Sequence, residues 1–139
     1  MNKYIPIAII LTIISSCAKQ DANEQIQYLD GYWSIEKAIL EDGTEKEFTI
    51  STTIDFMEIN GKTGIRKKVQ PKLDGTFLTS NDAETFEIKI EDDSLRLYYT
   101  TPFDSWKETV LKAKDSSLVV LNPDGKTYFY KKFATFNFQ

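Results

Sequence analysis

Histidine is absent from the 139-residue sequence, and cysteine occurs only once. The lack of histidine removes the most common general base, the most common zinc ligand and the usual pH switch. A single cysteine cannot form a disulfide within the chain, so the fold must be stabilised by apolar burial. The sequence also has no catalytic, phosphate-binding or metal-binding motif, so we predict no enzyme, no metal site and no cofactor.

An excess of positive charge is lacking too. The chain has 17 lysine and arginine residues against 21 aspartate and glutamate residues, which gives a net charge of −4. A mildly acidic protein does not attract nucleic acid over long distances, so we exclude nucleic acid as a partner. The length suits one domain. Aromatic residues make up 13% of the sequence, and they favour strands and give a small core a large apolar area.

The one long apolar run lies near the start of the chain, over residues 4–14, directly after the positively charged Lys3. It is too short for a transmembrane helix, which needs about 20 residues, and has the length typical of the apolar region of a signal peptide. Residues 14–17 read Ile-Ser-Ser-Cys. This motif resembles the lipobox of bacterial lipoproteins, in which an aliphatic residue and two small residues precede a cysteine that accepts lipid. We therefore predict a lipoprotein signal peptide over residues 1–16 and lipid attachment at Cys17.

The segment after Cys17 is polar and has no apolar period, which predicts a lipidated tether over residues 17–26. Two or more acyl chains are enough to hold a protein stably on a membrane. By resemblance to the lipoproteins of Gram-negative bacteria, the alanine at position 18 points to the outer membrane. We expect a protein anchored in the cell envelope, with the membrane as partner through the lipid on Cys17 and with either face of the outer membrane possible.

Residues 27–139 carry turn signals at short intervals, such as the Asn-Gly pair at 60–61. Apolar and polar residues alternate between the turns, as at 86–91, which is typical of strands with one buried face. Strands are predicted near residues 30–40, 52–59, 62–70, 76–80, 84–91, 94–101, 106–114, 117–122 and 126–133. A short helical turn is predicted within residues 22–29. Eight to nine strands joined by short turns predict an all-β antiparallel meander, which hides its edges by closing into a barrel or by folding into a sandwich. We favour the barrel.

Gly31-Tyr32-Trp33 opens the first predicted strand. Here the sequence resembles the lipocalin-like families, whose first strand begins Gly-x-Trp. The resemblance implies a lipocalin-like barrel over residues 27–139, with Gly31 allowing a tight turn and Trp33 plugging the closed end. The sequence departs from classical lipocalins in lacking a Thr-Asp-Tyr motif and in carrying Lys131-Lys132 where an arginine would pack over the tryptophan. It is most similar to short bacterial lipocalin-like lipoproteins.

The alternating rows predict which side chains face the barrel interior. The predicted ligand-lining residues are Ile54, Phe56, Phe86, Ile88, Leu97, Tyr99, Tyr128 and Tyr130, and Ile90 and Leu95 continue the same rows. In the second strand, Met57 and Ile59 fall out of phase with Ile54 and Phe56, which indicates a bulge. These rows carry almost no charge, so they predict a ligand that is apolar along most of its length.

Arg66-Lys67-Lys68 is the most concentrated basic stretch. It could attract the anionic head group of a fatty acid or similar lipid at the barrel mouth, or it could be the solvated face of an edge strand, which is the interpretation we favour. Asp55 and Glu58 have odd spacing within one strand, so they point to opposite faces and do not form a paired-carboxylate site.

Two functional hypotheses remain open. The first is a barrel that binds a small apolar or amphipathic molecule, since an eight-stranded barrel can enclose one ligand. The second is a barrel filled by its own side chains, which acts as an interaction module for another protein of the cell envelope. The size of the internal cavity distinguishes them.

Overall fold

The computed structural model describes residues 19–49 and 53–134, so the predicted signal peptide and Cys17 lie outside the described residues. One short helix, α1 (Ala22–Ile26), precedes nine strands. The strands are β1 (Gly31–Ile39), β2 (Glu45–Glu47), β3 (Ile54–Asn60), β4 (Thr63–Pro71), β5 (Phe77–Glu91), β6 (Ser94–Thr100), β7 (Ser105–Ala113), β8 (Ser117–Leu121) and β9 (Thr127–Lys132).

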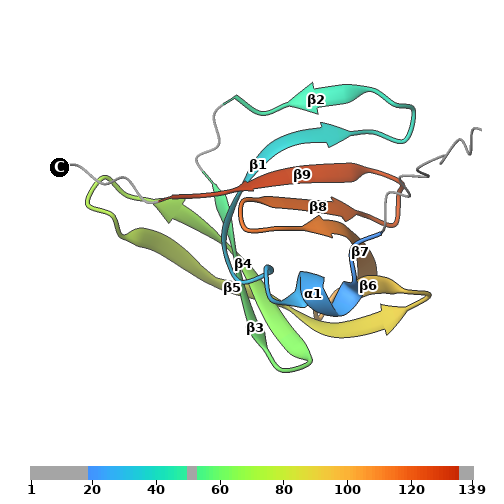
Figure 1. Cartoon of the computed structure of the whole chain (residues 1–139). Helices are drawn as coiled ribbons and strands as arrows, with labels where there is room; N and C mark the ends of the chain where they lie inside the picture. The colour runs from blue at the N-terminus through green and yellow to red at the C-terminus, as the bar shows by residue number, and fades with distance from the viewer. Residues whose placement is uncertain (1–18, 50–52, 135–139) are drawn as a thin grey trace, which may run out of the picture.

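The strands form one antiparallel sheet that closes on itself (Figure 1). From β3 to β9 each strand pairs with the next along the chain, as short hairpin connections require. β1 pairs with β3 on one side and with β9 on the other, so eight strands form a ring. β2 lies beside the end of β1, outside this ring. The predicted all-β meander and its closure into a barrel are confirmed.

Two strand predictions were wrong, although the predicted number of strands was right. β2 was missed because all three of its residues are charged and it has no apolar face. The two predicted strands at 76–80 and 84–91 form one continuous strand, β5. The polar residues between them do not form a turn. They lie in an irregularity of the β4–β5 ladder, where Lys67 pairs with Ala83 but Val69 pairs with Thr79.

The barrel end next to α1 is closed by a packed apolar core. α1 contacts β6 and β7 and covers this end. Trp33 is fully buried there, and its indole Nε1 donates a hydrogen bond of 2.9 Å to the carbonyl oxygen of Leu29. The buried members of the core cluster are Ala22, Leu29, Trp33, Met57, Phe86, Ile88, Leu95, Leu97, Tyr99, Val110, Ala113, Leu118, Val120 and Tyr130. We call the end of the barrel next to α1 the closed end.

Lys132 supplies a cation over Trp33. Its Nζ lies 4.5 Å from the centroid of the indole ring and donates a hydrogen bond of 2.6 Å to the carbonyl oxygen of Asp30. Gly31 has a φ of +124°, and a Cβ at this position would lie 2.5 Å from Lys132 Nζ. The lysine therefore takes the place over the tryptophan that the resemblance to classical lipocalins assigned to an arginine, and Gly31 leaves room for it.

Residues 19–26 belong to the folded domain, so the prediction of a tether up to residue 26 was wrong for this part. Lys19 Nζ donates to Ser94 Oγ at 2.7 Å. The Gln20 amide donates to the Ala113 carbonyl oxygen at 2.7 Å and accepts from the Ala113 N–H at 3.1 Å. Asp21 caps α1, which confirms the predicted helical turn. The side chains of Lys19 and Gln20 hold this segment against the barrel by hydrogen bonds, and such contacts leave no apolar pattern in the sequence.

Candidate functional site

The end of the barrel opposite α1 is open and holds a cavity of about 590 Å³. We call this cavity the cup. The loop between β6 and β7 and the turn between β8 and β9 form its rim, and side chains of β1, β4, β5, β7 and β9 form its wall. The lining residues are Ile35, Arg66, Lys68, Glu84, Asp104, Trp106, Glu108, Asn122, Pro123, Asp124, Tyr128 and Tyr130.

Arg66 lies at the floor of the cup. Side chains alternate across β4, so the residues at 64, 66 and 68 share the inner face. Gly64 makes room for Phe86 below the arginine, because a Cβ there would lie 2.3 Å from the Phe86 ring. The Arg66 side chain is 12% exposed. The barrel is therefore filled below Arg66 and open above it.

Four strands supply hydrogen-bond acceptors to Arg66. Its Nη2 donates to Asp55 Oδ2 at 2.7 Å and to the Tyr130 hydroxyl at 2.8 Å. Its Nη1 donates to both oxygens of Glu108 and to the Tyr99 hydroxyl, each at 3.3 Å. A buried guanidinium with two carboxylate partners is held rigidly, because each charge-assisted bond fixes its plane.

The environment of Arg66 moves the pKa values of its neighbours in different directions. Burial raises the pKa of Asp55, but the charges of Arg66 and Lys68 outweigh burial, so this pKa lies below its usual value. Burial also raises the pKa of Glu108, and there Arg66 only partly offsets it, so the pKa lies above its usual value. Burial raises the pKa of Tyr130 to about 12, so its hydroxyl stays protonated and can donate a hydrogen bond. Asp55 is thus the firmly ionised partner of Arg66.

One wall of the cup is aromatic. The Trp106 ring stacks on Tyr99, with centroids 5.1 Å apart and an interplanar angle of 5°. Tyr128 lines the cup from β9, and its hydroxyl lies 3.5 Å from the amide nitrogen of Asn122. Trp106 is half-buried, as its place at the start of a strand predicted. Stacking holds this flat apolar surface in place beside the polar floor.

The predicted ligand-lining residues separate into three groups. Tyr128 and Tyr130 line the cup. The second group, which packs in the core cluster below the cup, consists of Phe86, Ile88, Leu97 and Tyr99, with Leu95 beside them. Ile90 is 43% exposed at the end of its row.

Ile54 and Phe56 form the third group, and the prediction that they face the interior was wrong. Phe56 packs on Tyr32, with ring centroids 4.9 Å apart, on the outer side of the sheet. Ile54 lies opposite Val69, and both are buried outside the core cluster. The β3–β4 ladder continues without a register shift, so the predicted bulge is absent from it. Asp55 and Met57 are two residues apart in this regular strand, so both point to the inner face.

The basic stretch at 66–68 does not act as one patch. Arg66 points to the cup floor, and Lys68 reaches Asp55. Lys67 points outward, with its Nζ 5.6 Å from the centroid of the Phe56 ring. Neither of the two predicted interpretations describes it, because alternation along β4 separates its members.

The carboxylates in and beside the cup were missed from the sequence as members of a site. Asp55, Glu84 and Glu108 each lie two positions from an inward apolar residue, namely Met57, Phe86 and Val110. Extending each apolar row by one step of the alternation would have found them. The predicted separation of Asp55 and Glu58 is confirmed, since Asp55 is buried and Glu58 is exposed.

Two further features were sought in residues 19–49 and 53–134, a metal-binding cluster and a membrane-spanning helix. No group of three metal-binding side chains occurs there, and no helix there is long and apolar enough to span a membrane.

A family model of the lipocalin-like domain matches residues 29–120. Among solved structures, the chain is similar to a lipocalin-like protein from Bacteroides uniformis, with a TM-score of 0.48, 13% identity, and coverage of 76% of this chain and 98% of that chain. It is similar to an uncharacterized protein from Bacteroides eggerthii, with a TM-score of 0.47, 11% identity, and coverage of 76% and 99%. Apocrustacyanin C1 gives a TM-score of 0.46, 12% identity, and coverage of 88% and 74%. No curated protein matches the chain significantly.

Proposed function

The chain belongs to the lipocalin-like domain family, and we propose that it is a lipid-anchored binding protein that holds a small amphipathic molecule in the cup. The cup itself is the observation that carries this proposal. Its volume of about 590 Å³ lies within the range of small-molecule pockets, which is roughly 300–1,000 Å³. An aromatic wall beside a few fixed polar groups is the usual composition of such pockets.

The filled half of the barrel limits where the ligand can lie. Phe86, Tyr99 and the rest of the core cluster occupy the space below Arg66. A ligand therefore enters from the open end, rests its apolar part on Trp106 and Tyr128, and keeps part of its surface in water. This geometry suits a compact amphipathic molecule better than a long acyl chain.

Trp106 offers a direct test of binding. We expect the uncharged apolar dye N-phenyl-1-naphthylamine to bind at micromolar concentrations and to change the fluorescence of Trp106, because the cup places the dye beside this ring. The variant Trp33→Phe keeps Trp106 as the single tryptophan reporter, since the chain has two tryptophans. In the converse variant, Trp106→Phe, the signal from Trp33 should change less, because Trp33 is buried at the closed end and lies farther from the dye. An absence of dye binding at micromolar concentrations contradicts the proposed function.

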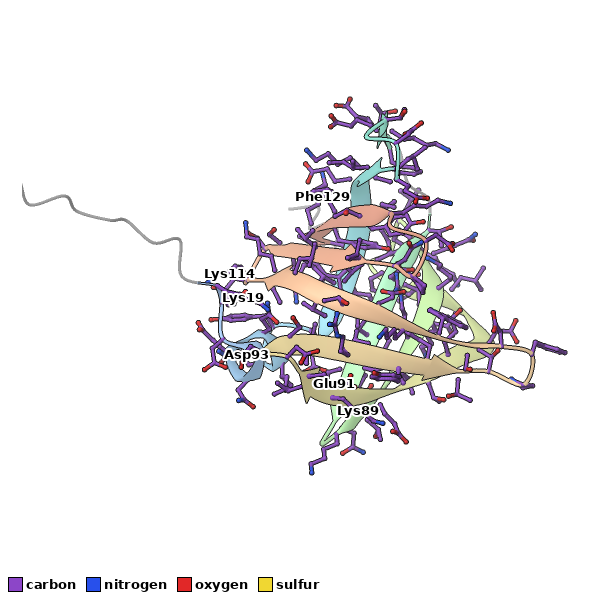
Figure 2. The ribbon with its side chains drawn as sticks, turned by 90° about the vertical axis from the view of Figure 1, so that its right-hand side faces the viewer. Lys19, Lys89, Glu91, Asp93, Lys114 and Phe129 are labelled. Carbon is purple, nitrogen blue, oxygen red and sulfur yellow. The ribbon has the colours of Figure 1, made fainter. Side chains whose placement is uncertain are left out.

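The docking of residues 19 and 20 supports a defined orientation on the membrane. Acyl chains on Cys17 would be attached two residues before Lys19, within about 7 Å along the chain. Lys19 and Gln20 are bonded to Ser94 and Ala113 at the closed end. Figure 2 shows Lys19 together with Lys114 at this end. We therefore propose that the closed end rests on the lipid surface and that the cup opens away from it.

This orientation can be measured because the lipidated protein has no free thiol of its own. We expect a fluorophore on Lys114→Cys to be quenched strongly by phospholipids that are spin-labelled on the head group. The same fluorophore on Phe103→Cys, in the loop at the cup rim, should be quenched weakly. Equal quenching at both positions contradicts the orientation.

The anchor itself has a separate control. Cys17→Ala should leave the precursor uncleaved or release the protein from membranes. A variant that is processed and sediments with membranes as the wild type does would overturn the lipid-anchor proposal without affecting the proposal for the cup.

A second candidate function is an interaction module for another protein of the cell envelope. The observation that favours it is the exposure of large apolar side chains at loops, since Phe103 is 96% exposed and Leu73 is 79% exposed. The filled lower barrel is also compatible with it. If no small molecule binds in the cup, the loops that carry Phe103 and the Asn60-Gly61 turn are the first surfaces to mutate.

A further inference from the structure

We propose that the ligand of the cup is an amine, with a cationic head group on an aromatic or otherwise flat apolar body. This inference rests on the proposed function and specifies the ligand class of the same site. It replaces the anionic head group that the basic stretch at 66–68 had suggested.

Both cations of the cup already have carboxylate partners. Arg66 lies between Asp55 and Glu108, with its donors occupied by these carboxylates and by two tyrosine hydroxyls. Lys68 is ion-paired with Asp55. An incoming carboxylate would have to break an existing charge-assisted hydrogen bond to reach Arg66, and it would leave a buried carboxylate unpaired.

Carboxylates outnumber cations on the lining of the cup. The lining holds two cationic side chains, Arg66 and Lys68, against the four carboxylates Glu84, Asp104, Glu108 and Asp124, which gives a net charge of −2. Low-dielectric walls focus such a field into the cavity, so it attracts a cation and repels an anion.

Glu84 is the carboxylate best placed to receive the cation. It lies opposite Arg66 in the β4–β5 register, on the same inner face, and it is half-buried. No hydrogen bond or ion pair joins its side chain to any other side chain within residues 19–49 and 53–134. It therefore differs from Asp55 and Glu108, whose charges are already compensated by Arg66.

The apolar part of the ligand follows from the opposite wall. Trp106 and Tyr128 present aromatic surface to the same cavity that Glu84 lines. A ligand whose aromatic ring stacks on Trp106 would have its short aminoalkyl chain within reach of the carboxylates across the cup. Rings of this kind also attract cations through their π faces, which adds to the preference for an amine.

A matched series of three ligands separates head-group recognition from apolar binding. The probes are 2-(1-naphthyl)ethylamine, 2-(1-naphthyl)ethanol and 1-naphthylacetate, which share a ring system and differ in charge. Titration calorimetry on the mature domain at pH 7 should show the amine binding at least tenfold more tightly than the alcohol and the carboxylate binding most weakly. The advantage of the amine should shrink as salt is added.

Two variants of β5 assign the effect to the cup. Glu84→Gln should weaken amine binding about tenfold and leave alcohol binding unchanged. Glu87→Gln is the matched control, because Glu87 is exposed on the outer face of the same strand, and it should change neither affinity.

The outcomes separate this inference from the proposed function. Equal affinities for amine and alcohol, or tightest binding of the carboxylate, overturn the amine inference while the binding cup stands. An amine preference that Glu84→Gln leaves unchanged removes Glu84 from the proposal and overturns it as stated. Failure of all three probes to bind overturns the proposed function together with the inference.

Discussion

Replacing Arg66 by methionine is expected to lower the free energy of unfolding by about 3–5 kcal/mol at pH 7, the usual cost of removing one partner from a buried ion pair. The variant leaves Asp55 and Glu108 in the barrel interior without the guanidinium that compensates them. Urea unfolding measures the loss. Lys67→Met is the matched control, because Lys67 lies on the outer side of the same strand, and its stability should stay close to that of the wild type.

The same variant should gain more stability than the wild type as pH falls from 7. The pKa of Asp55 is lowered in the folded wild type, so its contribution to stability is present above its ordinary pKa and is lost as pH falls through the lowered value. The pKa of Glu108 is already raised in the folded wild type, and without Arg66 the effect of burial is no longer offset, so protonation of Glu108 favours the folded variant more strongly. Asp55 keeps the opposing charge of Lys68. The difference in stability between wild type and Arg66→Met should therefore narrow from pH 7 to pH 4. A difference that stays constant would show that charge compensation does not cause the loss.

The second large effect is expected for Trp33→Ala, which should cost about 3–5 kcal/mol, as large aromatic-to-alanine changes in a core do. Trp33 is fully buried, donates a hydrogen bond to Leu29 and lies under the ammonium of Lys132. Trp106→Ala should cost less, because Trp106 is half-buried at the cup.

Denaturant midpoints compare the two tryptophan variants directly. Trp33→Phe should recover part of the loss, because it keeps a ring at the closed end but removes the hydrogen bond to Leu29. Equal midpoints for Trp33→Ala and Trp106→Ala would contradict the assignment of Trp33 to the closed end.

The barrel could be predicted from the sequence because most inward rows are apolar. Phe86, Ile88 and Leu97 alternate with polar residues, and in the structure they lie in the core cluster. The first apolar residues of β3 misled the prediction, since Ile54 and Phe56 are apolar but face outward, whereas Asp55 faces inward. A period of two shows that a strand has two faces, but it identifies the inner face only when that face is the more apolar one.

The candidate site was harder to predict because its inward side chains are charged. Burying a charged residue in a barrel interior costs free energy unless partners on other strands compensate its charge. Arg66 has such partners on β3, β6, β7 and β9. Such partners are distant in sequence, and no local pattern links them. The docking of Gln20 on Ala113 could not be predicted from the sequence either, because it depends on one amide side chain that reaches a strand 93 residues away.

The short strand β2 has a consequence for copies of the protein that are crowded together. Closure between β1 and β9 gives every strand of the ring two neighbours, whereas β2 pairs with β1 alone and is a free edge of the described sheet. Residues 77–84 of β5, which have no partner on β6, form another. The three residues of β2, Glu45, Lys46 and Glu47, are all charged and exposed. A brief charged edge is a poor template for strand addition from a second molecule. Copies that are crowded together should therefore not polymerise through β2.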